Sequence, residues 1–275
     1  MTENSNASQP LPSLCLIGGG QMGRAIVGGL IQAGTIRPDD LVVVDPSAQC
    51  RQWWIDQHPT AKCHASAEAV ETMPSIVLLA VKPPVMQRVA QSAPKQWAGR
   101  LLVSVAAGIT LDSMQTWFGH DRVIRVMPNT PCLVGQGASA FCAAAGATDE
   151  DQGHVKTMLE AVGIAIAVDE KQMNAVTGLS GSGPAYVFTI VEGLADGGVL
   201  AGLPRDLAMQ LAVQTVLGAA TMLKETGQHP GQLKDAVASP AGTTITGLNT
   251  LERRAVRAAM ADAVAAAKQR GDELG

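Results

Sequence analysis

Short apolar runs alternate with helical patterns over the first 168 residues. Runs such as 41-LVVV-44 and 101-LLVSVA-106 are almost continuously apolar, as parallel strands covered on both faces usually are. The predicted strands are 14–17, 41–44, 75–80, 101–106, 122–127, 137–143 and 164–168. The predicted helices between them are 22–33, 67–72, 84–92, 111–118 and 149–161. This alternation predicts an α/β domain built on a doubly wound sheet.

After about residue 169 the pattern becomes helical, rich in Ala and punctuated by Gly and Pro. The predicted helices are 184–201, 205–225, a shorter one from Pro230, and a last one that follows 240-PAG-242 to the C-terminus. We therefore expect a disordered tail at 1–12, an α/β domain at 13–168 and an all-α domain at 169–275. Because the all-α domain has few large side chains, we expect its helices to be buried against a second copy of the chain.

Composition narrows the classes of partner. The net charge is −4 with no basic stripe, which argues against nucleic acid or an anionic membrane surface. No uninterrupted apolar run reaches the ~18 residues of a membrane-spanning helix. The five Cys residues lack CxxC spacing, which favours reduced thiols in a cytoplasmic protein. The His residues lack metal-ligand spacing, so we expect no metal site.

The stretch 14-LCLIGGGQMGRAIVGGL-30 places Gly18-x-Gly20-x-x-Gly23 between an apolar strand and an amphipathic helix. In that context the spacing is typical of a Rossmann-type dinucleotide-binding domain. Gly18 allows the tight turn, Gly20 lets the backbone approach a pyrophosphate, and Gly23 permits close packing of helix on strand. The pyrophosphate is expected at the helix N-terminus, where N–H groups and the helix dipole favour negative charge.

The residues after the next two strands bear on the choice of cofactor. Asp45 ends the second strand, where an acid usually binds the ribose 2′-OH of NAD and repels the 2′-phosphate of NADP. Ser47 and Arg51 could nevertheless hold a phosphate, so the residues leave NAD and NADP open. Lys82, in 79-LAVKPP-84, is either a cation near the cofactor or a solvated side chain at a strand exit.

The segment 239-SPAGTTITGL-248 carries four hydroxyl side chains and no ionisable one. On the residue pattern alone, Ser239, Thr243 and Thr244 read most simply as N-capping groups of the helix that follows. Their catalytic use would require a substrate and a cofactor that bring the reactive groups themselves.

Six segments in this order resemble the pyrroline-5-carboxylate reductase family: 17-IGGGQMGRAIVGGL-30, 80-AVKP-83, 103-VSVAAGIT-110, 125-RVMPNTP-131, 177-TGLSGSGPAYVF-188 and 233-LKDAVASPAGTTITGLNTLE-252. The resemblance covers essentially residues 12–270. It implies reduction of Δ1-pyrroline-5-carboxylate to L-proline by NADPH or NADH. It also implies a helical domain that interlocks with a twofold mate, and in some members further assembly into decamers.

The resemblance also implies site residues. Thr244 would hydrogen-bond the ring nitrogen, Ser239, Gly242 and Thr243 would help hold the carboxylate, and Glu170 would lie near the imino acid. The implied cofactor contacts are Ile17, Gly18, Gly19, Gly20, Gln21, Met22, Gly23, Asp45, Pro46, Ser47, Ser66, Val81, Lys82 and Ala107. Asp45 stands where many relatives have an uncharged residue, so the preference between NADPH and NADH stays open.

Two other functions remain as alternatives. The first is another NAD(P)-dependent reductase, of cyclic imines or of β-hydroxyacids. The β-hydroxyacid class would need a Lys or His acid–base group on the second domain, and the hydroxyl-rich region offers only Lys234. The second is a non-catalytic dinucleotide sensor, which the intact hydroxyl segment argues against.

Overall fold

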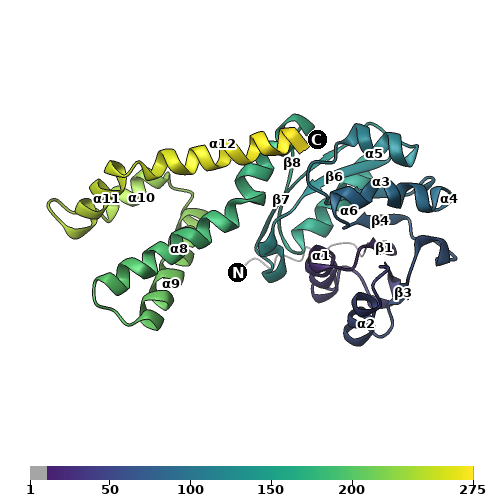
Figure 1. The fold of residues 1–275 in the computed structure, drawn as a ribbon, viewed down its shortest axis with the longest axis horizontal. Coiled ribbons are helices and arrows are strands. Elements are labelled where there is room, and N and C mark those ends of the chain that lie inside the picture. The colour runs from purple at the N-terminus through teal and green to yellow at the C-terminus, as the bar shows by residue number, and fades with distance from the viewer. Residues whose placement is uncertain (1–10, 275) are drawn as a thin grey trace, which may run out of the picture. The chain divides into compact units, whose positions relative to one another are not determined.

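A single sheet of eight strands organises the first part of the chain in this computed structural model, which describes residues 11–274. The strands are β1 (Leu14–Ile17), β2 (Leu41–Val44), β3 (Lys62–His64), β4 (Ile76–Leu79), β5 (Leu101–Ser104), β6 (Val123–Met127), β7 (Gly137–Ala143) and β8 (Gly163–Ala167). Their order is β3-β2-β1-β4-β5-β6-β7-β8, with β7 antiparallel to β6 and every other pair parallel. Figure 1 draws the strands as arrows, among them β1, β4 and β6 of the central part. The strand order reverses beside β1, the switch point at which such sheets bind dinucleotides.

Twelve α-helices are described within residues 11–274. They are α1 (Gln21–Gln32), α2 (Ala48–Gln57), α3 (Pro83–Ser92), α4 (Pro94–Trp97), α5 (Leu111–Phe118), α6 (Asp149–Glu160), α7 (Met173–Val176), α8 (Gly183–Leu200), α9 (Arg205–Thr226), α10 (Pro230–Ala236), α11 (Thr243–Arg253) and α12 (Val256–Leu274). The prediction of a doubly wound α/β sheet followed by a helical domain is confirmed.

Alternate residues of the central strands face two separate cores. Leu14 and Leu16 of β1 pack with α1, α2 and α6, through side chains such as Ile26 and Met158. Cys15 and Ile17 pack on the other face with α3 and α5. Because both faces are covered, β1 and β2 are apolar at every position, which produced the continuous runs in the sequence.

Two local predictions were wrong, and one edge strand was missed. The helix expected at 67–72 is only a 3-10 turn, Ala67–Ala69, after which Val70 is extended and buried. Pro74 disfavours helical backbone at the residue before it, so the turn is not continued. Strand β3 was not predicted, because a three-residue edge strand has no apolar run. The single last helix is two, α11 and α12, separated where Ala255 takes a positive φ of 53°.

Contacts divide the chain into two units, which are described separately. Unit 1 is the chain up to Gly181 together with the segment from Ala266, and unit 2 is Ser182–Ala265. This division falls later than the boundary expected at 168/169. Of the expected tail at 1–12, residues 1–10 lie outside the described part of the chain. Leu11, by contrast, is buried, and its N–H donates to Thr35 O at 3.0 Å.

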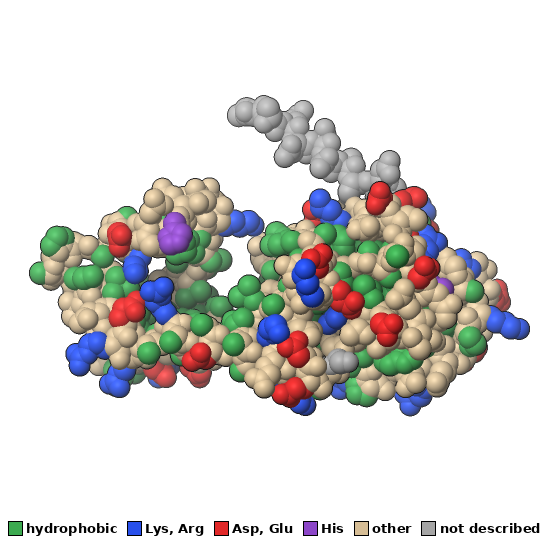
Figure 2. Space-filling model, turned by 90° about the horizontal axis from the view of Figure 1, so that it is seen from above, with side chains coloured by type: hydrophobic (Ala, Val, Ile, Leu, Met, Phe, Trp, Pro, Cys, Tyr) green, Lys and Arg blue, Asp and Glu red, His purple; other side chains and the backbone are tan. Residues whose placement is uncertain are grey.

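Unit 2 has little core of its own. Its buried apolar side chains are the alanines Ala195, Ala208 and Ala212, between α8 and α9. Many large apolar residues of these helices are exposed, and Figure 2 shows apolar side chains at the surface of this unit. Helix α9 is long and apolar enough to cross a membrane by length and composition, with a mean hydropathy of 1.2. Its exposed apolar positions are equally what a helix buried between two copies of the chain would present.

Candidate functional site

The turn between β1 and α1 has the geometry of a phosphate-binding loop. Gly18 has a φ of 95°, and a Cβ placed on it would lie 2.7 Å from Ala80 O. A Cβ on Gly23 would lie 2.6 Å from Gly18 O, so close packing of helix on strand requires glycine there. A Cβ on Gly20 would meet nothing within 4 Å, which leaves open space beside the N-terminus of α1. Gly20 caps α1 without a side-chain hydrogen bond, so the first-turn N–H groups face that space.

Both backbone polar groups of Gly19, its N–H and its carbonyl, form hydrogen bonds to side chains. Its N–H donates to Asp45 Oδ2 at 2.9 Å. Its carbonyl accepts from Trp54 Nε1 at 3.0 Å and from Arg24 Nε at 3.1 Å. Trp54 is completely buried, and Arg24 stacks over the neighbouring Trp53 ring at 4.0 Å. The sequence pattern did not indicate this contact, although a buried indole N–H usually has an acceptor.

The Asp45 carboxylate accepts two backbone hydrogen bonds. Besides the bond from Gly19, Oδ1 accepts from Ser47 N at 2.8 Å. Ser47 caps α2, with its hydroxyl accepting from Cys50 N at 3.3 Å. The Arg51 guanidinium donates to the carbonyl oxygens of Asp45 and Pro46, at 2.7 and 2.9 Å. The acid is therefore fixed in orientation at the end of β2.

A cavity of about 650 Å³ opens at the carboxyl ends of β1, β2 and β4. The predicted cofactor residues that line it are Ile17, Gly18, Gly20, Asp45, Pro46, Ser66, Val81 and Lys82. Those that do not line it are Gly19, Gln21, Met22, Gly23, Ser47 and Ala107. Four charged side chains line the cavity, the acids Asp45 and Glu68 and the bases Lys82 and Arg88.

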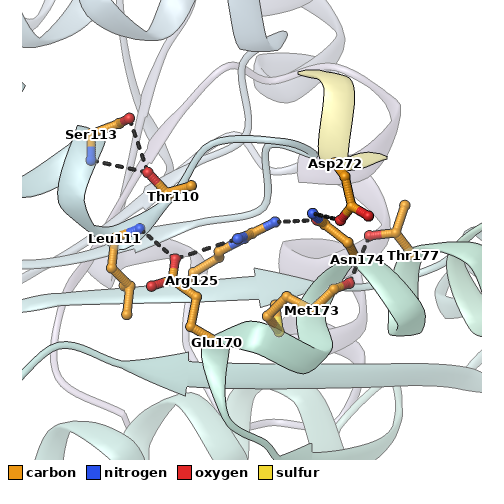
Figure 3. A network of polar contacts seen from close by, with 9 residues as sticks. All are labelled: Thr110, Leu111, Ser113, Arg125, Glu170, Met173, Asn174, Thr177 and Asp272. Carbon is orange, nitrogen blue, oxygen red and sulfur yellow. Dashed lines mark hydrogen bonds and ion pairs between the residues drawn. The ribbon is translucent and has the colours of Figure 1, made fainter. Parts of the chain in front are cut away.

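Glu170 lies in a polar network within unit 1 (Figure 3). Its Oε1 accepts from the Leu111 N–H, at the start of α5, at 2.7 Å and from Arg125 Nη1 at 3.4 Å. Arg125, buried on β6, also donates to Asn174 Oδ1 at 3.1 Å, and Asn174 Nδ2 donates to Asp272 Oδ1 at 2.8 Å. The sequence singled out Glu170 but none of these partners.

The hydroxyl-rich segment forms a tight turn before α11. Ala241 takes a positive φ of 57°, and Gly242 N–H donates to Ser239 O at 3.1 Å. Gly242 is the N-cap of α11 and has no side-chain capping bond, so the capping interpretation of the hydroxyls is wrong. Thr243 and Thr244 are the first two helical residues and are exposed. Uncapped N–H groups at a helix N-terminus favour an anion.

The Cys50 thiol beside the glycine loop is a poor nucleophile. Burial, with the nearby charge of Asp45 second, raises the pKa of the Cys50 thiol. Cys132 is buried beside Ser139. Within residues 11–274, no group of three His, Cys, Asp or Glu side chains is arranged to hold a metal ion.

The switch-point sheet, the glycine-rich loop and the cavity define a dinucleotide-binding protein of the Rossmann class. Residues 170–274 match the family model for pyrroline-5-carboxylate reductase dimerisation, and residues 13–108 match that for NADP oxidoreductase coenzyme F420-dependent. A pyrroline-5-carboxylate reductase of Arabidopsis thaliana is 48% identical over 259 residues, covering 94% of both chains. The chain belongs to the pyrroline-5-carboxylate reductase family.

Two solved structures of pyrroline carboxylate reductases are similar to this chain over nearly its whole length. The pyrroline-5-carboxylate reductase of Coxiella burnetii has a TM-score of 0.89 at 33% identity, over 96% of this chain and 98% of that one. The Plasmodium falciparum pyrroline carboxylate reductase with NADP bound has a TM-score of 0.87 at 32% identity, over 97% and 99%.

Proposed function

We propose that this chain reduces Δ1-pyrroline-5-carboxylate to L-proline, the last step of proline biosynthesis, with NADPH or NADH as reductant. The observation that carries the proposal is the 48% identity to a reductase of that name over 94% of both chains. The glycine loop and its cavity supply the independent physical argument, since both fit a dinucleotide.

The cavity and the loops beside it would hold the proposed cofactor in three parts. Gly20 leaves open space at the N-terminus of α1, where a pyrophosphate would accept hydrogen bonds from Gln21, Met22 and Gly23 N–H. We place the adenosine ribose beside Asp45, with Pro46, Ser47 and Ser66, and the nicotinamide toward Val81, Lys82 and Ala107. When bound, the reduced nicotinamide supplies the hydride that the carbon of the imine accepts.

The residues before α11 provide the proposed cradle for the substrate. The Thr243 and Thr244 N–H groups, with Gly242 at the N-cap and the Ser239 hydroxyl beside it, would donate to the substrate carboxylate. The Thr244 hydroxyl would hydrogen-bond the ring nitrogen and orient the imine. A protonated ring nitrogen makes the adjacent carbon strongly electrophilic, so the chain needs no strong acid there. We also propose that Glu170 lies near the bound imino acid.

Positioning is then the main contribution of the protein. Holding two reactants in the correct geometry can supply several kcal/mol, up to about 7–11 kcal/mol in the best model reactions. Thr244 is a catalytic residue in this proposal because its hydroxyl touches the reacting imine, although an unperturbed hydroxyl is too weak an acid to protonate it.

We propose a cytoplasmic homo-oligomer, built from a dimer, with a decamer as the higher assembly to test. The exposed apolar positions of α8 and α9, and a family model for dimerisation that spans 170–274, favour self-association. We place the domain boundary at 168/169, just after β8 ends at Ala167. The net charge of −4 favours neither nucleic acid nor an anionic membrane as a partner.

The direct assay follows the absorbance of the reduced nicotinamide on addition of Δ1-pyrroline-5-carboxylate, with NADH and NADPH in parallel, and identifies L-proline as product. Oxidation without proline would favour a different imine reductase. Binding of the cofactor without any oxidation would favour the sensor. Light scattering on the full chain would give the oligomeric state.

A further inference from the structure

The C-terminal turn of α12 contacts the loop that connects β5 to α5. Gly108 in this loop is buried, and the atoms closest to a Cβ placed on it belong to Leu274, at 3.4 Å or more. On the same turn Gly271 is buried against Asn174, whose side chain would lie 3.4 Å from a Cβ at that position. These are side-by-side contacts within unit 1, between residues far apart in the sequence.

A chain of polar contacts joins the same turn to the other end of the loop. Asp272 accepts from Asn174 at 2.8 Å, Asn174 accepts from Arg125 at 3.1 Å, and Arg125 pairs with Glu170 (Figure 3). Glu170 accepts from the Leu111 N–H at 2.7 Å, immediately after the loop. The Lys268 ammonium donates to the second Asp272 oxygen at 2.6 Å, which fixes that carboxylate.

The loop follows β5, the strand that pairs with β4 next to the cofactor cavity. Ser104 at the end of β5 pairs with Leu79 at the end of β4, and Val105 N–H donates to Leu79 O at 3.1 Å. The residues that follow Leu79, from Ala80 to Lys82, line the cavity. The loop therefore leaves the sheet beside the cavity, and α12 restrains it at Gly108 directly and at Leu111 through Glu170.

We propose that the C-terminal turn of α12 positions the loop at 105–110 against the nicotinamide end of the cofactor, with Asn174 and Asp272 as positioning residues. This inference rests on the proposed function for the identity of the cofactor. It adds that the last turn of the chain acts on cofactor binding through the Asn174–Asp272 hydrogen bond.

The test compares two ligands that differ at the nicotinamide. The dissociation constant of the reduced cofactor, NADPH or NADH, is measured by fluorescence. The dissociation constant of the matching ligand without nicotinamide, the 2′-phosphate of ADP-ribose for NADPH or ADP-ribose for NADH, is measured by competition. Asp272→Ala removes the acceptor of Asn174, whereas Asp272→Asn keeps an oxygen acceptor and is the conservative rescue. Glu273→Ala is the matched control, because Glu273 lies on the same turn in an exposed pair with Arg270.

For Asp272→Ala we expect the dissociation constant of the reduced cofactor to rise about twofold to tenfold, the loss typical of one hydrogen bond. The dissociation constant of the ligand that lacks nicotinamide should not change. Asp272→Asn and Glu273→Ala should resemble the wild type. Unchanged cofactor affinity in Asp272→Ala, an equal loss for both ligands, or an equal effect of Glu273→Ala would overturn the inference. Turnover of Δ1-pyrroline-5-carboxylate by the wild type tests the proposed function separately.

Discussion

Replacing Asp45 with Asn should shift cofactor preference toward NADPH. The Asp45 carboxylate lines the cavity and is fixed by N–H groups of Gly19 and Ser47, at 2.9 and 2.8 Å. Swinging the acid away from a phosphate would break both bonds. Among residues 11–274, Asp45 forms no salt bridge, so no side-chain cation neutralises it directly. A ribose 2′-phosphate near this acid should therefore be repelled.

The size of the effect follows from Coulomb's law. Two unit charges about 5 Å apart interact by about 1–3 kcal/mol at effective dielectric constants between about 80 and 20, as suits the half-buried Asp45. That energy corresponds to about 5- to 150-fold in relative affinity. Asn removes the charge but keeps one oxygen acceptor, so one of the two backbone bonds should persist. High salt should reduce the wild-type discrimination, since this site is partly open to solvent.

The assay is the ratio of kcat/KM for NADPH to that for NADH, supported by dissociation constants of both cofactors. Asp56→Asn is the matched control. It makes the same change in net charge as Asp45→Asn, but Asp56 lies on α2 and does not line the cavity. The ratio should rise in Asp45→Asn and stay constant in Asp56→Asn. An unchanged ratio in Asp45→Asn, or equal changes in the two variants, would refute the electrostatic reasoning.

Three further outcomes are expected. Thr244→Ala should lower kcat strongly and leave cofactor binding intact; an unchanged kcat would remove Thr244 from the mechanism. Gly18→Ala should abolish cofactor binding, measured by fluorescence, because the added Cβ lies 2.7 Å from Ala80 O at a φ of 95°. Burial tends to raise the pKa of Asp151, but hydrogen bonds and charge from Arg122 hold it below its ordinary 3.8. The pair should therefore stabilise the fold at neutral pH by about 1–3 kcal/mol and lose that contribution as pH falls through the lowered pKa. Thermal melts of wild type and Asp151→Asn should converge in acid, and a constant difference would count against the pair.

The strands were predictable where local sequence decides them. β1, β2 and β7 begin and end at the predicted residues. For β1 and β2 the reason is that a strand buried on both faces must be apolar throughout. β3 pairs only with β2, and its middle residue Cys63 is half-buried, so the sequence Lys62–His64 carries no strand pattern. The break at Ala255 carries no Gly or Pro, so no local signal separates α11 from α12.

In the candidate site, too, some residues could be predicted from the sequence and others could not. Gly18, Gly20 and Gly23 were predictable because their spacing within one turn is itself the constraint. The partners of Glu170 were not predictable, since Arg125 and Asp272 reach the network from β6 and from the end of α12. Such contacts depend on tertiary packing, which no periodicity in the chain records.

The most direct test of the central claim is transfer of label from the cofactor. The chain is incubated with Δ1-pyrroline-5-carboxylate and NADPH or NADH carrying deuterium at the hydride-donating carbon of the nicotinamide. We predict L-proline with one deuterium on the ring carbon that was double-bonded to nitrogen, in proportion to the cofactor oxidised. Proline without label, or cofactor that binds but is not oxidised, would contradict the account.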